Sequence, residues 1–318
     1  MQTYFCAPEV RRKLRIKLFT HTDLDGIACY IVSKMFFDVV DVEFCDYTNI
    51  NESVAQFLEN RGAEYFDYVY FTDISFSPET AKMVDNLISA EPDEHAFNIG
   101  RFKLFDHHPT AHHLDMYSWC TVKTEKEEIG MPCGTTMFLD YLVSLYGSVP
   151  VAVEEFVELT RRYDTWEWKT VFHDDCPMQL NCLIGLYGAK RFTDKMIETL
   201  RSPIDNFYLD DMDMLLLEID SEKKATYFVK KENEMFKYDY KDYVVGVVQA
   251  DQYVSELGNY LAEKNPSVDL IALIGDKTIS YRTVKDIDLG LMAKELGGGG
   301  IPKAAGSQIC FGKTFDYI

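Results

Sequence analysis

The sequence predicts an α/β protein with an N-terminal parallel sheet, a helical connector and a smaller C-terminal α/β domain. Short apolar runs alternate with helix-like segments from residue 14 to residue 105, which is typical of a parallel sheet with helices on both faces. A long charged helical segment occupies about residues 205–237, and a second strand–helix series begins at residue 243. We therefore predict a first domain over residues 1–190, a connector over 191–240 and a second domain over 241–318.

The N-terminal series begins with two strands and two helices. Residues 14–19 alternate basic and apolar side chains and form the first expected strand. Apolar spacing predicts a helix over 27–37, and a second strand is expected at 39–44. Residues 51–61 again have helical spacing, and Asn51 at their start is interpreted as a helix cap.

Two further strands complete the expected sheet. They cover residues 68–72 and 102–105, and Ser77-Pro78-Glu79 starts a helix between them that runs through residues 80–89. The series indicates a Rossmann-like sheet, in which ligands bind beyond the carboxyl ends of the strands.

The remaining elements follow the same patterns. Two helices are expected after the sheet, over residues 135–146 and 151–163. The second domain is expected to contain strand 243–249, helix 254–264, strands 270–275 and 278–283, and helix 289–296.

Composition excludes several classes of function. The net charge is −20, so a broad basic face for long duplex nucleic acid is not expected. No stretch approaches the roughly 20 apolar residues that a membrane span needs. The eight cysteines contain no CxxC pair, which favours reduced thiols in a cytoplasmic protein. The sequence leaves a homodimer open.

Acidic and histidine residues follow each of three expected strands. Because the carboxyl ends of parallel strands meet at one edge of a sheet, we expect one site there. Asp164, which follows the helix at 151–163, is expected to join it. The residues are His21, Asp23 and Asp25 after the first strand, Asp73 after the third, and Asp106, His107 and His108 after the fourth.

This set has the chemistry of a site for two divalent cations. Carboxylates bridge such ions, and imidazole or further carboxylates complete their coordination. No cysteine lies among the candidates, so Mn²⁺ is expected, with Mg²⁺ or Co²⁺ as alternatives. Two such ions activate a bridging water for hydrolysis of a phosphoester. The expected ligands are His21, Asp23, Asp25, Asp73, His107 and Asp164.

The four segments resemble the motifs of the DHH phosphoesterase superfamily. The matches are His21-Thr22-Asp23-Leu24-Asp25-Gly26, Asp73, Asp106-His107-His108 and Asp164. The resemblance implies a di-manganese site, with His21 and Asp23 on one ion, Asp25, His107 and Asp164 on the other, and Asp73 between them. It also implies that Asp106 orients the cluster and that His108 faces the scissile phosphate. No motif reaches His112 and His113, which favours a surface loop for them.

The C-terminal region resembles the DHHA1 domain that accompanies one branch of this superfamily. Ser280-Tyr281-Arg282 matches its Ser-x-Arg strand, and Gly298-Gly299-Gly300 followed by Ala304-Ala305-Gly306 matches its glycine-rich signature. The resemblance implies that Ser280, Arg282 and the three glycines bind substrate. Ile301 stands where the family has histidine, and Lys303 is the candidate to replace it.

The whole pattern is most similar to the NrnB-type oligoribonucleases, or nanoRNases. This resemblance implies a metal-dependent phosphodiesterase that cuts short RNA or DNA oligonucleotides to mononucleotides. Cyclic or linear dinucleotides and 3′-phosphoadenosine 5′-phosphate are alternative substrates. A non-catalytic nucleotide-binding protein is the alternative from another class, and Ile301 is the feature that favours it.

Overall fold

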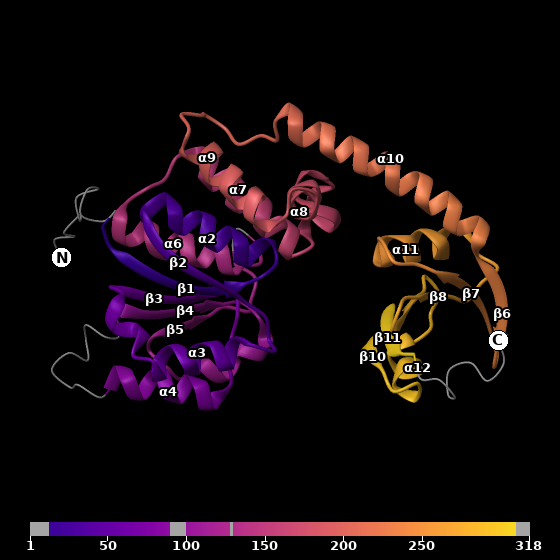
Figure 1. Cartoon of the computed structure of the whole chain (residues 1–318), viewed down its shortest axis with the longest axis horizontal. Coiled ribbons are helices and arrows are strands. Elements are labelled where there is room, and N and C mark those ends of the chain that lie inside the picture. Colours follow the sequence, from indigo (N-terminus) through magenta and orange to yellow (C-terminus); the bar gives the residue numbers. More distant parts are fainter. Residues whose placement is uncertain (1–12, 90–99, 128–129, 310–318) are drawn as a thin grey trace. The chain divides into compact units, whose positions relative to one another are not determined.

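The computed structural model describes residues 13–89, 100–127 and 130–309. The chain divides into two compact units, with the border between Leu216 and Leu217 (Figure 1). The predicted three-part division, with borders after residues 190 and 240, stays a prediction. None of the described helices is long and apolar enough to cross a membrane.

The first unit is built on a parallel sheet with the strand order β2-β1-β3-β4-β5. This confirms the predicted fold class. The short edge strand β5 was not predicted. The strands are β1 (Arg15–His21), β2 (Val39–Cys45), β3 (Tyr68–Thr72), β4 (Phe102–Asp106) and β5 (Cys120–Val122).

Helices cover both faces of this sheet (Figure 1). On one face lie α2 (Leu24–Phe36) and α6 (Gly134–Tyr146), and on the other lie α3 (Ile50–Glu59) and α4 (Pro78–Ser89). The face toward α3 and α4 carries an aromatic core in which Phe71 stacks on Phe19 and packs edge-on against Phe76. Burial of this core holds the strand ends in fixed positions.

One element begins differently from the prediction. Asn51 does not cap α3, because it is the second residue of the helix and Asn49 occupies the cap position. The Asn51 side chain instead accepts hydrogen bonds from the Ser77 backbone N–H and the Thr80 hydroxyl. A tertiary contact to the start of α4 has replaced the local capping contact.

After α6 the described chain continues with α7, α8, α9 and α10. Helix α7 (Val151–Asp164) matches the prediction to within one residue, whereas α8 (Cys176–Tyr187) and α9 (Ala189–Arg201) were not predicted. The charged segment forms α10 (Asp211–Glu234), as expected, and the border between the units falls inside it.

The second unit contains a six-stranded sheet of order β10-β11-β9-β8-β7-β6. All neighbours are antiparallel except β7 and β8. Helix α11 (Val254–Lys264) packs on one apolar cluster of this unit and α12 (Leu289–Glu295) on another. The strands are β6 (Phe236–Tyr240), β7 (Tyr243–Gln249), β8 (Leu270–Ile274), β9 (Thr278–Arg282), β10 (Gly299–Ile301) and β11 (Ala304–Gln308).

Candidate metal centre

The candidate site lies where the strand order of the first unit reverses. The chain passes from β1 to β2 on one side, and then to β3 on the other side of β1. The connections that follow the neighbouring strands β1 and β3 therefore run in opposite directions. In sheets of this kind, ligands bind in the crevice between two such connections. His21 is the last residue of β1 and Asp73 directly follows β3, so both stand at this crevice.

All six predicted ligands come together there. Nδ1 of His21 lies 2.8 Å from Oδ2 of Asp23 and 3.9 Å from Oδ2 of Asp73. Nε2 of His107 lies 3.3 Å from Oδ1 of Asp73 and 3.4 Å from Oδ2 of Asp164. The groupings that could hold an ion are His21–Asp23–Asp73, Asp25–His107–Asp164 and Asp73–His107–His108.

Several polar atoms in this cluster are buried and lack a hydrogen bond of good geometry within the described residues, although Nδ1 of His21 lies at ion-pair distance from Asp23. Protein interiors rarely leave such atoms unpaired. All of those in the cluster belong to carboxylates or imidazoles, which are the donors that a hard or borderline divalent cation accepts. The residues present therefore fit a divalent metal. The atoms are Nδ1 of His21, both Oδ atoms of Asp73, Oδ2 of Asp106, Nε2 of His107 and Oδ2 of Asp164.

Asp25 is fixed by the start of α6, a contact that sequence reasoning missed. Its two carboxylate oxygens accept hydrogen bonds from the backbone N–H groups of Gly134, at 2.6 Å, and Thr135, at 2.9 Å. The Thr135 hydroxyl also donates to the Asp25 carbonyl oxygen at 2.7 Å. A carboxylate at a helix N-terminus is electrostatically favoured, so this contact holds the Asp25 side chain in place. The sequence signal was the Cys-Gly-Thr-Thr start of that helix.

Asp73 sits in a strained backbone conformation. Its φ is 58°, in the left-handed region that side chains other than glycine seldom adopt, although aspartate tolerates it best. Gly134 faces it closely, because a Cβ added at Gly134 would lie 2.6 Å from Cβ of Asp73. Strain of this kind persists where the surroundings require one side-chain direction, and it is common at functional sites.

Asp106 and His108 form a separate pair beside the cluster. Asp106 is fully buried, and its Oδ1 bonds to the backbone N–H of His108 at 3.0 Å and to Nδ1 of the ring at 2.8 Å. This bond leaves Nε2 of His108 for a ligand. Burial lowers the pKa of His108, but the hydrogen bond and charge of Asp106 outweigh it, so the pKa lies above its ordinary value.

The cluster also shifts the ionisation of its own members. Burial, followed by the charges of Asp25 and Asp23, raises the pKa of Asp73 well above its ordinary value and that of Asp164 to about 8. Burial lowers the pKa of His107. Raised pKa values are expected where carboxyl groups are buried close together. A bound divalent cation would lower the pKa of these carboxyl groups again.

A cavity of about 470 Å³ adjoins the cluster through His108. Tyr47, in the loop after β2, is 49% exposed on one side of it, and its ring lies 5.6 Å from the His21 ring and 6.2 Å from the His108 ring. Phe76, on another side, is held by stacking on Trp119. The lining residues are Tyr47, Asn51, Ser75, Phe76, Ser77, His108 and Thr110.

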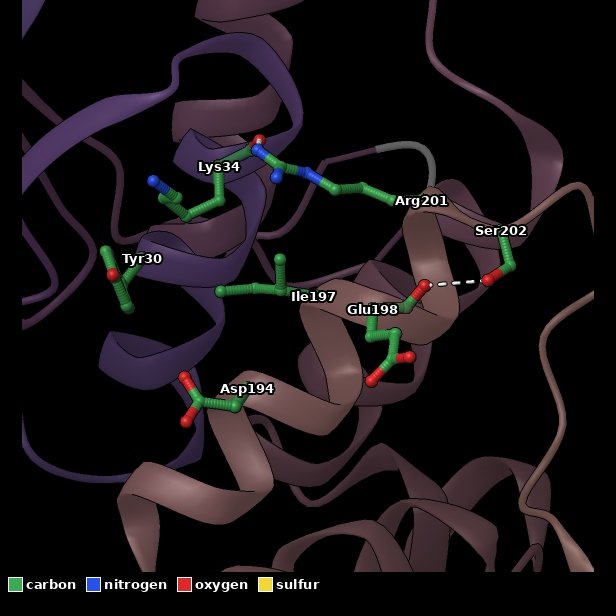
Figure 2. A pocket seen from close by; sticks show the side chains of 7 residues that line it. All are labelled: Tyr30, Lys34, Asp194, Ile197, Glu198, Arg201 and Ser202. Carbon is green, nitrogen blue, oxygen red and sulfur yellow. Dashed lines mark hydrogen bonds between the residues drawn. The ribbon is translucent and has the colours of Figure 1, made fainter.

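Another pocket, of about 610 Å³, lies between α2 and α9 (Figure 2). It contains none of the predicted site residues. Its lining mixes cations and anions, with Lys34 and Arg201 beside Asp194 and Glu198. His112 and His113 also lie outside the cluster, since Nε2 of His113 contacts the Phe76 carbonyl oxygen at 2.9 Å.

The substrate-binding residues predicted in the second unit gather around β9. Ser280 pairs with Gly306 of β11, and Gly306 pairs with Gly299 of β10. The Arg282 guanidinium donates to the Ser255 hydroxyl at 2.7 Å and to the Tyr281 carbonyl oxygen at 2.8 Å. The ammonium of Lys303 donates to the Lys285 carbonyl oxygen.

The glycine run has a structural explanation in strand contact. A Cβ at Gly298 would lie 2.0 Å from the Gly306 carbonyl oxygen. Gly300 has a φ of 147°, and a Cβ there would lie 2.4 Å from Cα of Ala305. The run is therefore an ordered part of the β10–β11 pair and not a free loop. Ile301, at the end of β10, is 66% exposed.

Comparison with known proteins gives a consistent result. No family model matches the chain. It is 35% identical over 298 residues to oligoribonuclease NrnB of Bacillus subtilis, covering 92% of this chain and 72% of that protein. The pGpG-specific phosphodiesterase PggH of Vibrio cholerae superposes with a TM-score of 0.51 at 12% identity, covering 93% of this chain and 94% of that one. RecJ of Thermus thermophilus, crystallised with Mn²⁺, gives a TM-score of 0.49 at 13% identity, covering 96% and 51%.

Proposed function

Because the chain belongs to the NrnB-type oligoribonucleases of the DHH phosphoesterase superfamily, we propose that it is a metal-dependent phosphodiesterase that hydrolyses short oligonucleotides to mononucleotides. The observation that carries the proposal is the convergence of six carboxylate and imidazole side chains, among which Asp73, His107 and Asp164 have buried atoms without a hydrogen-bond partner in the described residues. A structural network of buried polar groups would satisfy these atoms internally. A ligand-binding site leaves them for the ligand.

The six residues divide naturally between two ions. His21 and Asp23 would hold one, Asp25, His107 and Asp164 the other, and Asp73 is close to both groups. Two bound cations would supply an activated water and stabilise charge on the phosphate. Mn²⁺ is the proposed ion, because the donor set contains oxygen and imidazole nitrogen but no thiolate.

The protein's own contribution is to orient the scissile phosphate. Asp106 fixes the ring of His108 through Nδ1 and directs Nε2 away from itself. The raised pKa keeps the ring protonated to higher pH than an ordinary histidine, so that Nε2–H is a charged donor for a phosphate oxygen. Asp106 and His108 are therefore assigned to catalysis and not to metal binding.

The cavity beside His108 supports a short substrate. Its volume of about 470 Å³ is in the range of small-molecule sites, and Tyr47 offers an exposed aromatic face on which a base can stack. We assign one nucleotide next to the scissile phosphate to this cavity. The net charge of −20 is consistent with this assignment, since a short substrate needs no extended basic track.

In the second unit, Ser280, Arg282, the glycines 298–300 and Lys303 are assigned to holding a substrate phosphate. The support is their gathering on β9, β10 and β11. Arg282 and Lys303 already bond to protein oxygens, so binding requires them to exchange these partners for phosphate oxygens.

The experiment that tests this function follows hydrolysis of end-labelled RNAs of two to five nucleotides with Mn²⁺ and with chelator. Cyclic and linear dinucleotides and 3′-phosphoadenosine 5′-phosphate are run in parallel. Stepwise release of mononucleotides, lost with chelator, is the expected result. If only the dinucleotides, or only the bisphosphate, are hydrolysed, the proposed substrate changes from oligonucleotides to that compound.

A non-catalytic function predicts a different outcome in the same assay. Metal-loaded protein would then bind nucleotides but hydrolyse none of them. Tyr47→Ala and Tyr47→Phe sharpen the substrate assignment. Loss of base stacking should raise KM by about 10-fold in the alanine variant, whereas the phenylalanine variant keeps the ring and should remain close to wild type.

A further inference from the structure

A buried arginine lies one helical turn before Asp164. Arg161 is 0% exposed and bonds to protein groups in three directions. Its Nε and Nη2 bond to the two carboxylate oxygens of Glu158 at 2.7 and 2.8 Å. Its Nη1 bonds to Oε2 of Glu167 at 2.6 Å and to the Met131 carbonyl oxygen at 3.2 Å. We call Arg161, Glu158 and Glu167, together with the Met131 backbone, the Arg161 clamp.

We propose that the Arg161 clamp positions Asp25 and Asp164, two of the carboxylates assigned to the metal centre, relative to one another; this inference rests on the proposed function. Arg161 is a positioning residue, because its guanidinium contacts neither of these two carboxylates in any described hydrogen bond or ion pair. The clamp acts on two segments that are distant in sequence and that each support one carboxylate.

The first segment is the carboxyl end of α7. Asp164 is its last helical residue, three positions after Arg161. The Thr165 backbone N–H and hydroxyl both donate to the Arg161 carbonyl oxygen, at 3.0 and 2.8 Å, and close the helix there. Glu167 lies shortly after Asp164 in the sequence, and its carboxylate accepts a hydrogen bond from the Arg161 guanidinium. Glu158 before Asp164 and Glu167 after it are thus both bonded to the buried side chain of Arg161.

The second segment is residues 130–135, which lead into α6. Glu167 accepts a hydrogen bond from the Met131 backbone N–H at 3.3 Å, while Arg161 donates to the Met131 carbonyl oxygen. Three and four residues later, Gly134 and Thr135 donate to Asp25. Gly130 packs so tightly on the clamp that an added Cβ would lie 2.4 Å from Nη1 of Arg161.

The choice of arginine follows from this geometry. A buried ion pair seldom adds stability over apolar residues of equal volume, so we assign this one a geometric role. The planar guanidinium reaches two carboxylates and a carbonyl at fixed angles, which the single ammonium of lysine cannot reproduce. Groups hydrogen-bonded directly to metal ligands commonly contribute 10- to 100-fold to metal affinity, and the clamp supports such groups, the backbone N–H groups of Gly134 and Thr135.

The test measures Mn²⁺ affinity by calorimetry or by electron paramagnetic resonance of the free ion, on folded protein. Glu167→Gln keeps the side-chain volume but removes the charge, and Arg161→Met removes the guanidinium that joins the other members of the clamp. We expect Mn²⁺ affinity to fall about 10-fold in the first and up to about 100-fold in the second. Arg161→Lys should not restore it.

Arg162→Gln is the matched control. Arg162 is the next residue of α7 and also bonds to Glu158, at 2.7 Å, but no described contact joins it to residues 130–135. Its variant should bind Mn²⁺ like wild type. Circular dichroism and thermal unfolding of every variant establish that it is folded.

Two outcomes overturn the proposal. Glu167→Gln that is folded and binds Mn²⁺ with wild-type affinity shows that the clamp does not position the ligands. Variants that lose thermal stability while their folded forms keep wild-type Mn²⁺ affinity show a purely structural clamp. Wild-type protein that binds no Mn²⁺ is a distinct result, because it rejects the metal centre itself.

Discussion

The two regions assigned to the reaction differ in how their polar groups are satisfied. In the first unit, buried atoms of His21, Asp73 and His107 lack hydrogen-bond partners among the described residues. In the second, the cations of Arg282 and Lys303 are already bonded to protein oxygens. The first region is therefore organised for a ligand in advance, whereas the second has to exchange contacts when a ligand binds.

This difference predicts unequal consequences of mutation. A preorganised cluster loses function when one member is removed, because the remaining charges no longer balance. When a region exchanges hydrogen bonds to protein for hydrogen bonds to a ligand, it contributes to binding only the difference in free energy between the two sets of bonds. Substitutions in the cluster should therefore act on turnover, and those around β9 on substrate binding.

The largest expected effect is that of His107→Ala. His107 Nε2 is close to both Asp73 and Asp164, so its loss disrupts two groupings of ligands at once. We expect kcat to fall at least about 1,000-fold, in the range of lost electrostatic stabilisation, while the protein remains folded. His112→Ala, an exposed histidine outside the cluster, is the control, and wild-type turnover in His107→Ala would contradict the site assignment.

The second expected effect is on stability without metal. Asp164 has an ordinary pKa of 3.8 and a pKa of about 8 in the folded protein, and that of Asp73 is raised too. A carboxyl whose pKa is raised by folding contributes stability below the unfolded pKa and loses it as pH rises toward the folded pKa. The metal-free protein should therefore become less stable between pH 4 and 8.

Thermal unfolding measures this effect. We expect Tm of the metal-free protein to drop by at least about 5 °C from pH 5.5 to pH 8, and saturating Mn²⁺ to reverse the drop. Asp164→Asn removes one of the titrating groups and should flatten the slope. A Tm that is independent of pH in the metal-free wild type would show that these carboxyls do not repel one another as the geometry indicates.

A smaller effect is expected for Arg282→Ala. The guanidinium lies in the second unit and bonds to Ser255 and Tyr281, so it is assigned to binding and not to the chemical step. KM for a trinucleotide should rise about 10-fold, with kcat changed less than about 3-fold. Steady-state kinetics separate the two constants, and a dominant loss of kcat would place Arg282 in the chemistry and remove the contrast between the regions.

The smallest effect is expected for Ile301→His. Ile301 is exposed at the end of β10, so the substitution disturbs no core. An added imidazole should improve kcat/KM for oligonucleotides by no more than about 5-fold, which corresponds to about one hydrogen bond. An unchanged kcat/KM would indicate that Lys303 or another group already fills the position.

Strand and helix patterns were sufficient to predict the parallel sheet because its central strands β1, β3 and β4 are largely buried and its helices α3 and α4 are amphipathic. The edge strand β5, helices α8 and α9, and strands β6, β10 and β11 of the second unit were missed. The first has three residues and is only partly buried, and α8 has apolar residues around most of its surface, which obscures the helical period. Asn51 was misassigned as a helix cap because the local sequence does not distinguish an asparagine that caps a helix from one whose side chain bonds to another element.

The convergence of the candidate ligands was predicted because each lies at or near an element end at the same edge of the sheet. Their supports were not predicted. Gly134 and Thr135 reach Asp25 across more than 100 positions, and Tyr47 lies in a loop without a motif. Such contacts depend on three-dimensional packing, which local periodicity does not encode. The pairing of Gly299 and Gly300 with β11 was missed for the same reason.

The bond between Asp25 and the start of α6 has a consequence for biosynthesis. Asp25 is translated early, but its backbone partners at Gly134 and Thr135, and the remaining carboxylate at Asp164, emerge from the ribosome much later. A nascent chain that ends before residue 164 therefore exposes clustered carboxylates with no complete centre to bind an ion. Under the proposed function, metal loading would be a late step of folding, and ribosome-bound chains of increasing length should acquire protease protection by Mn²⁺ only after α7 has been released.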